Sequence, residues 1–189
     1  FALLEFVKVL DPPIGRLRNL DHVLKATGFK TARQVYGLAP QIEDRHLGAD
    51  DARAHATLGF VSMWPGLYDD AVREHKTAMR LSPYSPHAVR IGLGQALMLQ
   101  GQDEEALAEL EAVLDDDLSP FSEAWARRVM AIVLDALGRQ DEARETVAKM
   151  VEVFPAWTIA WDSGATRAFR DREMIAAQHD TLRRLGLPE

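Results

Sequence analysis

Several short stretches of the sequence carry residue types that could perform catalysis or bind an ion. Asp162-Ser163-Gly164 could supply a nucleophile, Asp115-Asp116-Asp117 could attract a cation, and Gly92-Leu93-Gly94 forms part of a phosphate-binding loop. Each stretch lacks what its chemistry needs: no base stands at a fixed spacing from the serine, Pro120-Phe121 stands where a calcium loop needs its Gly, and the glycine pair falls inside a predicted helix. We therefore expect the serine stretch to be part of a helix, the three aspartates to form a solvated loop, and the two glycines to lie at a helix–helix contact.

The histidines and the paired acids give no stronger signal. None of the six histidines pairs with another at i, i+3 or i+4, and His75 falls on a predicted packing face, where we expect a packed, hydrogen-bonded side chain rather than a metal ligand. Acid pairs such as Glu104-Glu105 belong to helix starts. The sequence has no cysteine and no His-Glu-x-x-His, Gly-x-Ser-x-Gly or P-loop motif. It predicts a non-catalytic chain without metal or cofactor.

Composition and charge discount some classes of partner and indicate the fold class. The formal net charge is −7 and no long Lys/Arg run occurs, so nucleic acid and anionic membrane surfaces are discounted as partners. No apolar run reaches the ~20 residues of a membrane helix. The absence of cysteine fits a reducing, cytoplasmic compartment. Abundant Ala, Leu, Glu and Arg favour an all-α fold.

One short pattern occurs three times. Gly66-Leu67-Tyr68-Asp69-Asp70-Ala71 recurs in type at 101–106 and at 138–143, at spacings of 35 (101 − 66) and 37 (138 − 101) residues. Each copy predicts a helix end and a new helix start, because Gly adopts the left-handed conformation easily and acidic residues favour a helix N-terminus. The last residue of each copy is expected to be buried between two helices: Ala71, Ala106 and Ala143.

Small residues and prolines keep similar offsets around the three copies. The small residues that precede the copies by equal distances are Gly59, Gly94 and Ala131. Pro83 and Pro155 follow the second helix at equal offsets, Pro120 stands two residues late, and all three are expected to stop that helix. The predicted helix pairs are 52–64 with 68–81, 87–99 with 103–115, and 123–136 with 140–153.

This pattern resembles the tetratricopeptide repeat, which reads Trp-x-x-Leu-Gly-x-x-Tyr, Ala-x-x-x-Phe and Pro over about 34 residues. The strongest matches are Leu58, Gly59, Ala71, Ala78 and Pro83, then Leu93, Gly94, Leu97 and Ala106, then Leu134, Ala143 and Pro155. The family's Trp and Phe are replaced by His55, Arg90 and Arg127 and by His75, Leu110 and Val147. The resemblance implies an all-α fold, a right-handed α-α superhelix (solenoid) of antiparallel helix pairs.

The repeats divide the chain into three regions. Residues 1–51 are expected to be degenerate N-terminal helices, a worn repeat or a linker, and residues 52–155 three repeats. Residues 156–189 are expected to form a degenerate C-terminal repeat with a capping helix over 171–185, since an end repeat needs a polar outer face. Trp157 and Trp161 are predicted to lie in the core of this last repeat.

The resemblance also implies where a partner binds. In this family the first helix of each pair lines a concave surface that takes an extended peptide or a partner helix. The partner-binding groove would be lined by Arg53, Phe60, Met63, Ile91, Gln95, Met98, Trp125, Arg128, Ile132 and Asp135. The alternative is that the apolar members are inter-helix core, because helical stripes are core more often than sites. Trp125 and Arg128 are favoured as binding residues, because both types are enriched at binding hot spots.

Two stretches, 50–56 and 182–189, are similar to repeat tails of bacterial regulators of the class III adenylate/guanylate cyclase type. This resemblance implies a catalytic or signalling domain upstream of Phe1. The function predicted first is a non-catalytic protein–protein interaction scaffold that binds a peptide or partner helix. The alternatives are a regulatory or sensory domain of a larger enzyme such as a nucleotide cyclase, and a homo-oligomerisation module.

Overall fold

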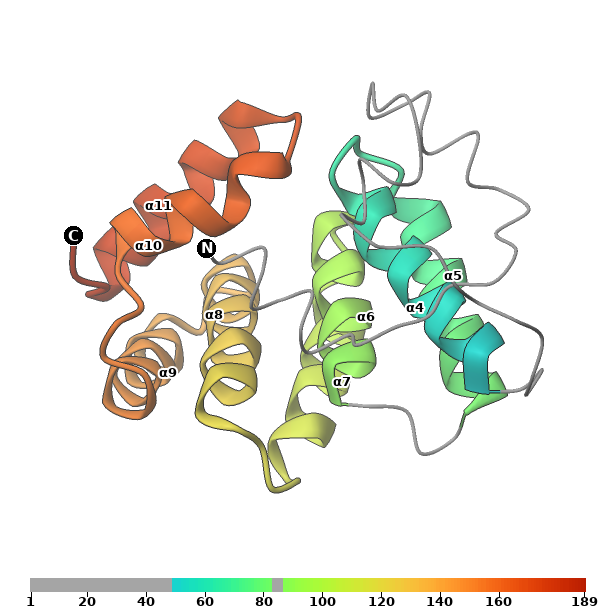
Figure 1. The fold of residues 1–189 in the computed structure, drawn as a ribbon. Coiled ribbons are helices and arrows are strands. Elements are labelled where there is room, and N and C mark those ends of the chain that lie inside the picture. The colour runs from blue at the N-terminus through green and yellow to red at the C-terminus, as the bar shows by residue number, and fades with distance from the viewer. Residues whose placement is uncertain (1–48, 83–86) are drawn as a thin grey trace.

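A computed structural model describes residues 49–82 and 87–189, and within these ranges the chain is helical without a β-strand (Figure 1). The elements are α4 (Ala49–Met63), α5 (Tyr68–Leu81), α6 (His87–Leu99), α7 (Asp103–Leu114), α8 (Pro120–Ala136), α9 (Gln140–Val153), α10 (Ile159–Ala165), the 3₁₀ turn η1 (Thr166–Ala168) and α11 (Arg172–Leu185). The helices expected before residue 49, and Pro83, lie outside the described residues.

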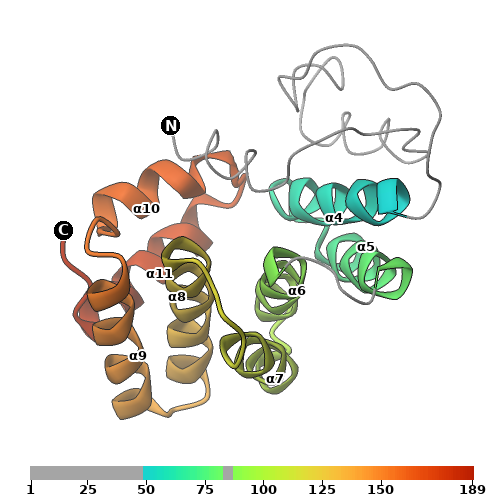
Figure 2. The same cartoon turned by 60° about the horizontal axis from the view of Figure 1, so that its bottom comes forward.

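Three antiparallel helix pairs follow one another along the chain: α4 with α5, α6 with α7, and α8 with α9 (Figures 1 and 2). The first helices of neighbouring pairs also contact each other, α4 with α6 and α6 with α8. The fold is therefore an all-α, α–α solenoid, as predicted. The predicted helix boundaries differ from those in the structure by at most three residues, at the starts of α4 and α8.

Each pair turns at the glycine that the repeat pattern identifies. Gly66, Gly101 and Gly138 have φ angles of 92°, 74° and 76°. Within the described ranges, nothing lies within 4 Å of a Cβ placed on any of them, so the backbone conformation and not the space requires Gly. The residue after each glycine donates its N–H to a carbonyl five positions earlier: Leu67 to Ser62, Gln102 to Leu97 and Arg139 to Leu134. This Schellman arrangement satisfies a carbonyl that the helix end leaves free.

Small residues let the two helices of a pair approach closely. Ala71, Ala106 and Ala143 are each 0 % exposed, which confirms the predicted helix phase. A Cβ added to Gly94 would lie 2.9 Å from the Cγ atom of Leu110, closer than ordinary van der Waals contact. The glycine pair of α6 therefore serves helix packing, as expected.

Basic residue types replace the family's Trp, and two of the three contact acids of the second helix. The guanidinium of Arg90 lies 3.3 Å from a carboxylate oxygen of Glu109, and the His55 ring contacts the Glu74 carboxylate. The third replacement, Arg127, pairs with Glu123 of its own helix. At two of the three positions where the family has Trp, this chain thus has a polar contact between the helices of a pair.

Pro120 has a different role from the one predicted. It does not stop α7, which ends at Leu114, but stands at the start of α8, where Ser119 is the N-cap and accepts a hydrogen bond from the N–H of Ser122. Proline suits this position because the first helical N–H needs no partner and its fixed φ is already helical. The acidic loop from Asp115 to Asp117 is exposed, as expected.

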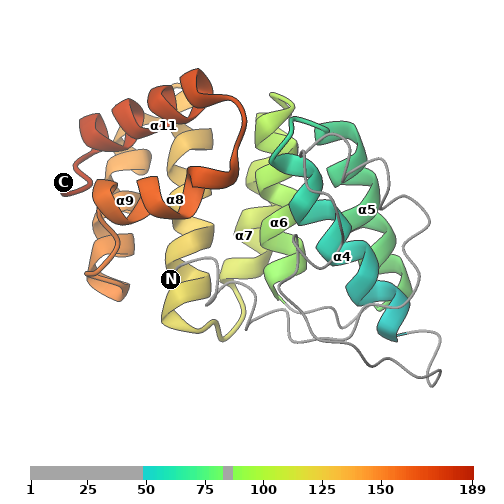
Figure 3. The ribbon, with the colours of Figure 1, turned by 45° about the horizontal axis from the view of Figure 1, so that its top comes forward.

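The C-terminal segment does not form a fourth copy of the repeat. Helix α11, over the residues expected to form a closing helix, packs on α8 and α9, and α10 passes across α8 (Figure 3). The N–H of Ile159 donates to the carbonyl of Pro188 at 2.8 Å. The N–H of Arg170 donates to the carbonyl of Trp64 at 2.8 Å, so the segment reaches from the third pair back to the end of α4.

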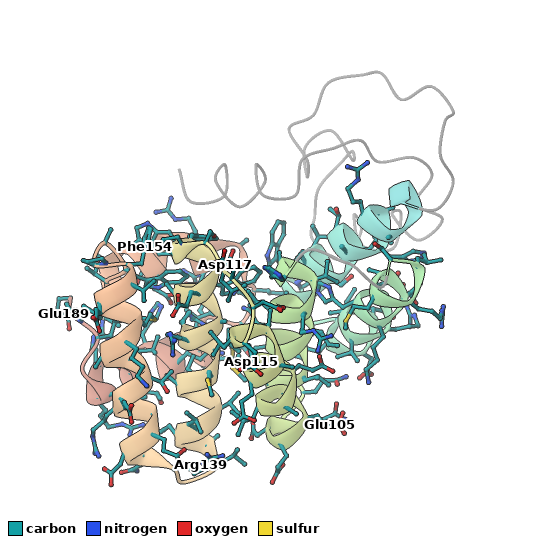
Figure 4. The ribbon with its side chains drawn as sticks, turned by 90° about the horizontal axis from the view of Figure 1, so that it is seen from below. Glu105, Asp115, Asp117, Arg139, Phe154 and Glu189 are labelled. Carbon is teal, nitrogen blue, oxygen red and sulfur yellow. The ribbon has the colours of Figure 1, made fainter. Side chains whose placement is uncertain are left out.

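The two ends of the helix pairs lie at opposite edges of the molecule. In Figure 4, Glu105 and Arg139 lie near one edge, close to the glycine turns, while Asp117 and Phe154 lie near the other edge. The second edge is where α8 begins and α9 ends.

Candidate partner-binding site

The first helices of the three pairs and the C-terminal segment enclose a half-open hollow of about 80 Å³. Its lining residues come from α4, α6, α8, α10 and the adjoining turns: Phe60, Met63, Trp64, Gln95, Phe121, Trp125, Arg128, Trp157, Trp161, Asp162, Ala165, Thr166 and Phe169. Pockets for cofactors and drug-sized molecules measure ~300–1,000 Å³. The hollow therefore has room for a single side chain rather than for a cofactor.

Aromatic rings make up most of the wall. Phe121 is central: its ring stacks on Trp157 with 5.7 Å between centroids and meets Trp161 edge-on at 6.1 Å. The Trp157 and Trp161 rings are 4.3 Å apart. Trp157 is buried, as predicted, whereas Trp161 is only partly buried and forms part of the rim. Offset and edge-on ring pairs of this kind add ~0.5–1.5 kcal/mol each beyond the area that they bury.

A second set of rings connects the first pair to the third. Trp125 of α8 lies 5.6 Å from Phe60 of α4, and its indole N–H donates to the side-chain oxygen of Gln95 at 3.0 Å. These three residues come from the three first helices, so one ring contact and one hydrogen bond add to the contacts between α4, α6 and α8. The Trp125 ring is anchored in place before any partner binds.

Asp162 of α10 is the centre of a buried polar network. One of its oxygens accepts hydrogen bonds from Nε of Arg128 at 2.6 Å and from the indole N–H of Trp157 at 2.9 Å. The other accepts from Nη2 of Arg128 at 2.9 Å and lies 2.9 Å from Nε2 of His179. The same Arg128 nitrogen donates to Gln178 at 3.1 Å. The network joins α8, α10 and α11.

Charge balance explains how this network tolerates burial. Arg128 is 2 % exposed and Asp162 is 0 % exposed. Burial alone would raise the pKa of Asp162, but the Arg128 guanidinium and the hydrogen bonds from His179, Arg128 and Trp157 hold it well below its ordinary value. Asp162 is therefore ionised at neutral pH, and the bidentate pair leaves little net charge on the wall of the hollow.

Five of the ten sequence-predicted groove residues line the hollow: Phe60, Met63, Gln95, Trp125 and Arg128. All five are buried, with only small parts of their surfaces accessible. The guanidinium of Arg128, which sequence reasoning makes available to a partner, is already held by Asp162.

The other five predicted residues lie elsewhere. Ile91 and Met98 are buried in the core, and Ile132 is partly buried against it. Arg53 is exposed, and the carboxylate of Asp135 pairs with Arg184 of α11 at 3.1 Å.

The C-terminal contributors to the hollow were missed by sequence reasoning. The sequence analysis places Asp162 only in a nucleophile motif and Phe121 only in the loop after the acidic run, and Phe169 has no predicted role. One signal was present: Arg128 and Asp162 are 34 residues apart, about one repeat length, so the repeat register of the sequence alone gives them corresponding positions. Opposite charges at equivalent positions of neighbouring first helices predict a contact between these helices.

His75 is buried, but the expected hydrogen bond is absent. Its side chain is 0 % exposed, and neither ring nitrogen has a hydrogen-bond partner among the described residues. The ring packs edge-on against Phe60 at 4.6 Å, in space that Gly59 and Gly92 leave free because a Cβ on either would lie within 2.8 Å of it. Burial lowers the pKa of His75 to about 3. The imidazole therefore takes the place of the family's Phe as a neutral aromatic ring.

Metal chemistry and membrane insertion find no support in the described parts of the chain. Across residues 49–82 and 87–189, no three His, Cys, Asp or Glu side chains gather where they could hold a metal ion. In the same ranges, no helix has the length and hydropathy needed to cross a bilayer.

Comparison with known proteins agrees with the repeat geometry. Residues 65–126 match the family model described as tetratricopeptide repeat. Among solved structures, the first tetratricopeptide repeat domain of human RPAP3 protein is similar at 18 % identity and a TM-score of 0.53, over 70 % of this chain and 98 % of that one. MamA (41-end) from Desulfovibrio magneticus RS-1 is similar at 18 % identity and 0.52, over 89 % and 87 %. Comparison with curated proteins gives no match.

Proposed function

Because this chain is a tetratricopeptide repeat protein, we propose that it is a non-catalytic scaffold that binds a peptide segment or helix of a partner protein in its concave layer. Repeats of this family generally mediate protein–protein interaction. The observation that carries the proposal is the aromatic hollow, which lies where the three first helices meet. Tryptophan supplies a large, rigid apolar surface at low entropic cost, which suits a binding site.

The residues proposed to contact the partner divide by accessibility. Phe121 and Trp161 are partly exposed and form the rim, while Phe60, Met63, Gln95, Trp125 and Arg128 form the floor. Ile91, Met98 and Ile132 support the floor from the core. Arg53 and Asp135 remain candidates for contacts beyond the hollow.

The proposed partner is a protein in the cytoplasm. The net charge of −7 disfavours nucleic acid and anionic membrane surfaces, and a cysteine-free chain suits a reducing compartment. The same charge disfavours a strongly acidic segment.

Peptide display on the full chain tests the proposal. We expect a library of random 12-residue peptides to yield a family of related binders whose affinity falls at least ~10-fold for Trp161→Ala, because tryptophans at such sites are often hot spots. The control is Leu81→Ala, which removes an exposed apolar side chain (41 % exposed) from α5, outside the hollow. Failure to enrich any binder that distinguishes these two variants would contradict the proposed function.

The regulatory alternative rests on the two short sequence stretches alone and stays a prediction. A catalytic signature in sequence upstream of Phe1 would favour this alternative.

A further inference from the structure

We propose that the hollow binds one aliphatic side chain, of leucine or methionine size, from a partner segment that is neutral or basic around that residue. This inference rests on the proposed function and specifies the chemistry of the partner. It follows from three properties of the hollow: the hydrogen bonding of its polar groups, its volume and the charge around it.

Four polar side chains of the wall already make hydrogen bonds within the protein. Arg128 and Asp162 bind each other in a bidentate pair, and Gln95 accepts the indole N–H of Trp125. The Thr166 hydroxyl donates to the carbonyl of Asp162 at 2.8 Å. A charged or amide side chain placed against these four groups would lose its water without gaining an equivalent partner, which is costly. An apolar side chain meets no such penalty.

The volume selects among apolar side chains. A cavity of ~150 Å³ holds a benzene ring, and this hollow has about half of that volume, about 80 Å³. An aliphatic chain of a few carbon atoms fits this space, whereas a phenyl or indole ring would have to displace the walls. The walls are held by ring contacts and by the Asp162 network, so displacement is unfavourable.

On the Phe121 side of the hollow the surrounding charge is acidic and selects the neighbours of that side chain, whereas exposed Arg167 and Arg170 flank the wall at Thr166 and Phe169. No Lys or Arg occurs between Arg90 and Arg127. The exposed acidic loop from Asp115 to Asp117 directly precedes Phe121 of the rim, and Asp117 lies near the same edge of the molecule as Phe154 (Figure 4). A partner segment that inserts its aliphatic residue past Phe121 approaches these carboxylates, which favour a neutral or basic segment.

A disulfide-tethering experiment on the full chain tests the hollow directly. The sequence has no cysteine, so one substitution creates a single thiol. Ala165→Cys places it in the wall, and Ala160→Cys places it on the exposed side of the same helix as a matched control. Each variant is equilibrated, in a thiol buffer, with disulfides bearing isobutyl, methylthioethyl, benzyl, carboxymethyl or aminoethyl tails, and the adducts are measured by intact-protein mass spectrometry.

We expect the isobutyl and methylthioethyl tails to form adducts with Ala165→Cys at least ~10-fold more favourably than the carboxymethyl tail, because burying a few methylene groups has an effect of that size. The benzyl tail should fall below both aliphatic tails, and Ala160→Cys should show little preference among the tails. Equal adducts at the two positions, or a preference for the benzyl or a charged tail at Ala165→Cys, would overturn the inference whether or not the protein binds peptides.

The displayed peptides provide the second arm. The inference requires an aliphatic residue at one fixed position of the binders, loss of binding when that residue becomes Asp, and loss of binding to Ala165→Leu but not to Ala160→Leu. Peptides that bind without these features would overturn the inference and leave the proposed function standing. Two results would overturn the assignment of a partner protein. One is binding of a peptide of residues 1–10 in the hollow, and the other is a dimer of this chain, detected by light scattering, in which the second copy fills the hollow.

Discussion

The repeat junctions and the C-terminal cap, which consists of α10, η1 and α11 (Ile159–Leu185), differ in the contacts that hold them. Between the helices of each pair, buried Ala and Gly residues allow close packing, and the same apolar contact recurs from pair to pair. The cap also buries apolar side chains, Ile175 and Leu182 among them, but it adds one buried ion pair, Arg128 with Asp162, and the hydrogen bonds around it. Packing can be distributed over many residues, whereas a buried polar network loses most of its stabilisation when one member is removed.

The largest effect is expected from removing the centre of the cap network. Asp162→Ala should lower the free energy of unfolding by ~3–5 kcal/mol, because it leaves the Arg128 charge buried without a partner. Urea unfolding followed by circular dichroism measures this. The control, Asp141→Ala, removes an exposed partner of Arg144 and should cost less than ~1 kcal/mol.

A double substitution sharpens the same point. Asp162→Leu with Arg128→Met removes both charges, so it should be less destabilising than Asp162→Ala alone. If the double variant is the less stable of the two, the ion pair contributes more to the free energy of unfolding than the cost of leaving the Arg128 charge unpaired.

Overpacking a repeat junction should cost less than breaking the cap. Ala106→Leu should lower the free energy of unfolding by ~1–3 kcal/mol, since a side chain with 0 % exposure has no room to grow. Ala108→Leu adds the same atoms to an exposed position of α7 and should leave the melting temperature nearly unchanged. Equal melting of the two variants would show that the junction is less tightly packed than the structure has it.

His75 makes the first junction sensitive to acid. Burial lowers the pKa of His75 from an ordinary value of 6.5 to about 3, so between these values the unfolded chain binds a proton that the folded chain does not. The free energy of unfolding is therefore highest above pH 6.5, and it decreases as the pH falls from 6.5 toward 3. His75→Phe should remove ~2 kcal/mol of the loss between pH 7 and pH 5.

The measurement for His75 is urea unfolding at both pH values. His55 and His179, which pair with Glu74 and Asp162, are present in both proteins and so cancel in the comparison. His87→Phe, at a half-buried position beside Asp116, replaces a histidine outside this junction and serves as the control. An unchanged pH dependence in His75→Phe would mean that water reaches the ring.

The smallest effects are expected at two glycines, and with opposite signs. Gly101→Ala forces a side chain into a positive φ and should cost ~1–2 kcal/mol. Gly164→Ala, in the exposed face of α10 with no atom within 4 Å of the new Cβ, should gain ~0.5–1 kcal/mol. Melting temperatures that shift in the same direction would contradict the Schellman assignment of the repeat turns.

The sequence predicted the repeat array well because its determinants are local and recur. The glycine, the acidic helix start and the buried Ala of each copy lie within six residues, so three copies can be compared directly. The cap offered no such comparison. Its contacts join residues 34 and 50 positions apart and occur only once, so the hollow could be predicted only on the side of the first helices.

The hydrogen-bond partners of individual polar residues could not be predicted from the sequence either. Whether His75 has a partner depends on Phe60 and on the glycines that face it across three helices, and no residue near His75 in sequence reports this. The role of Arg128 likewise depends on a carboxylate brought to it by the cap.

The bond between the N–H of Arg170 and the carbonyl of Trp64 has a consequence for how the protein unfolds. In an open solenoid each unit touches only its neighbours, so unfolding can begin at an end and spread stepwise. Here the two bonded residues are 106 positions apart (170 − 64), and Phe169 is buried beside them. Loss of α4 therefore removes support from the C-terminal segment, and loss of that segment removes support from α4. The first described pair and the C-terminal segment are thermodynamically coupled, and the three pairs should unfold in one cooperative transition rather than stepwise.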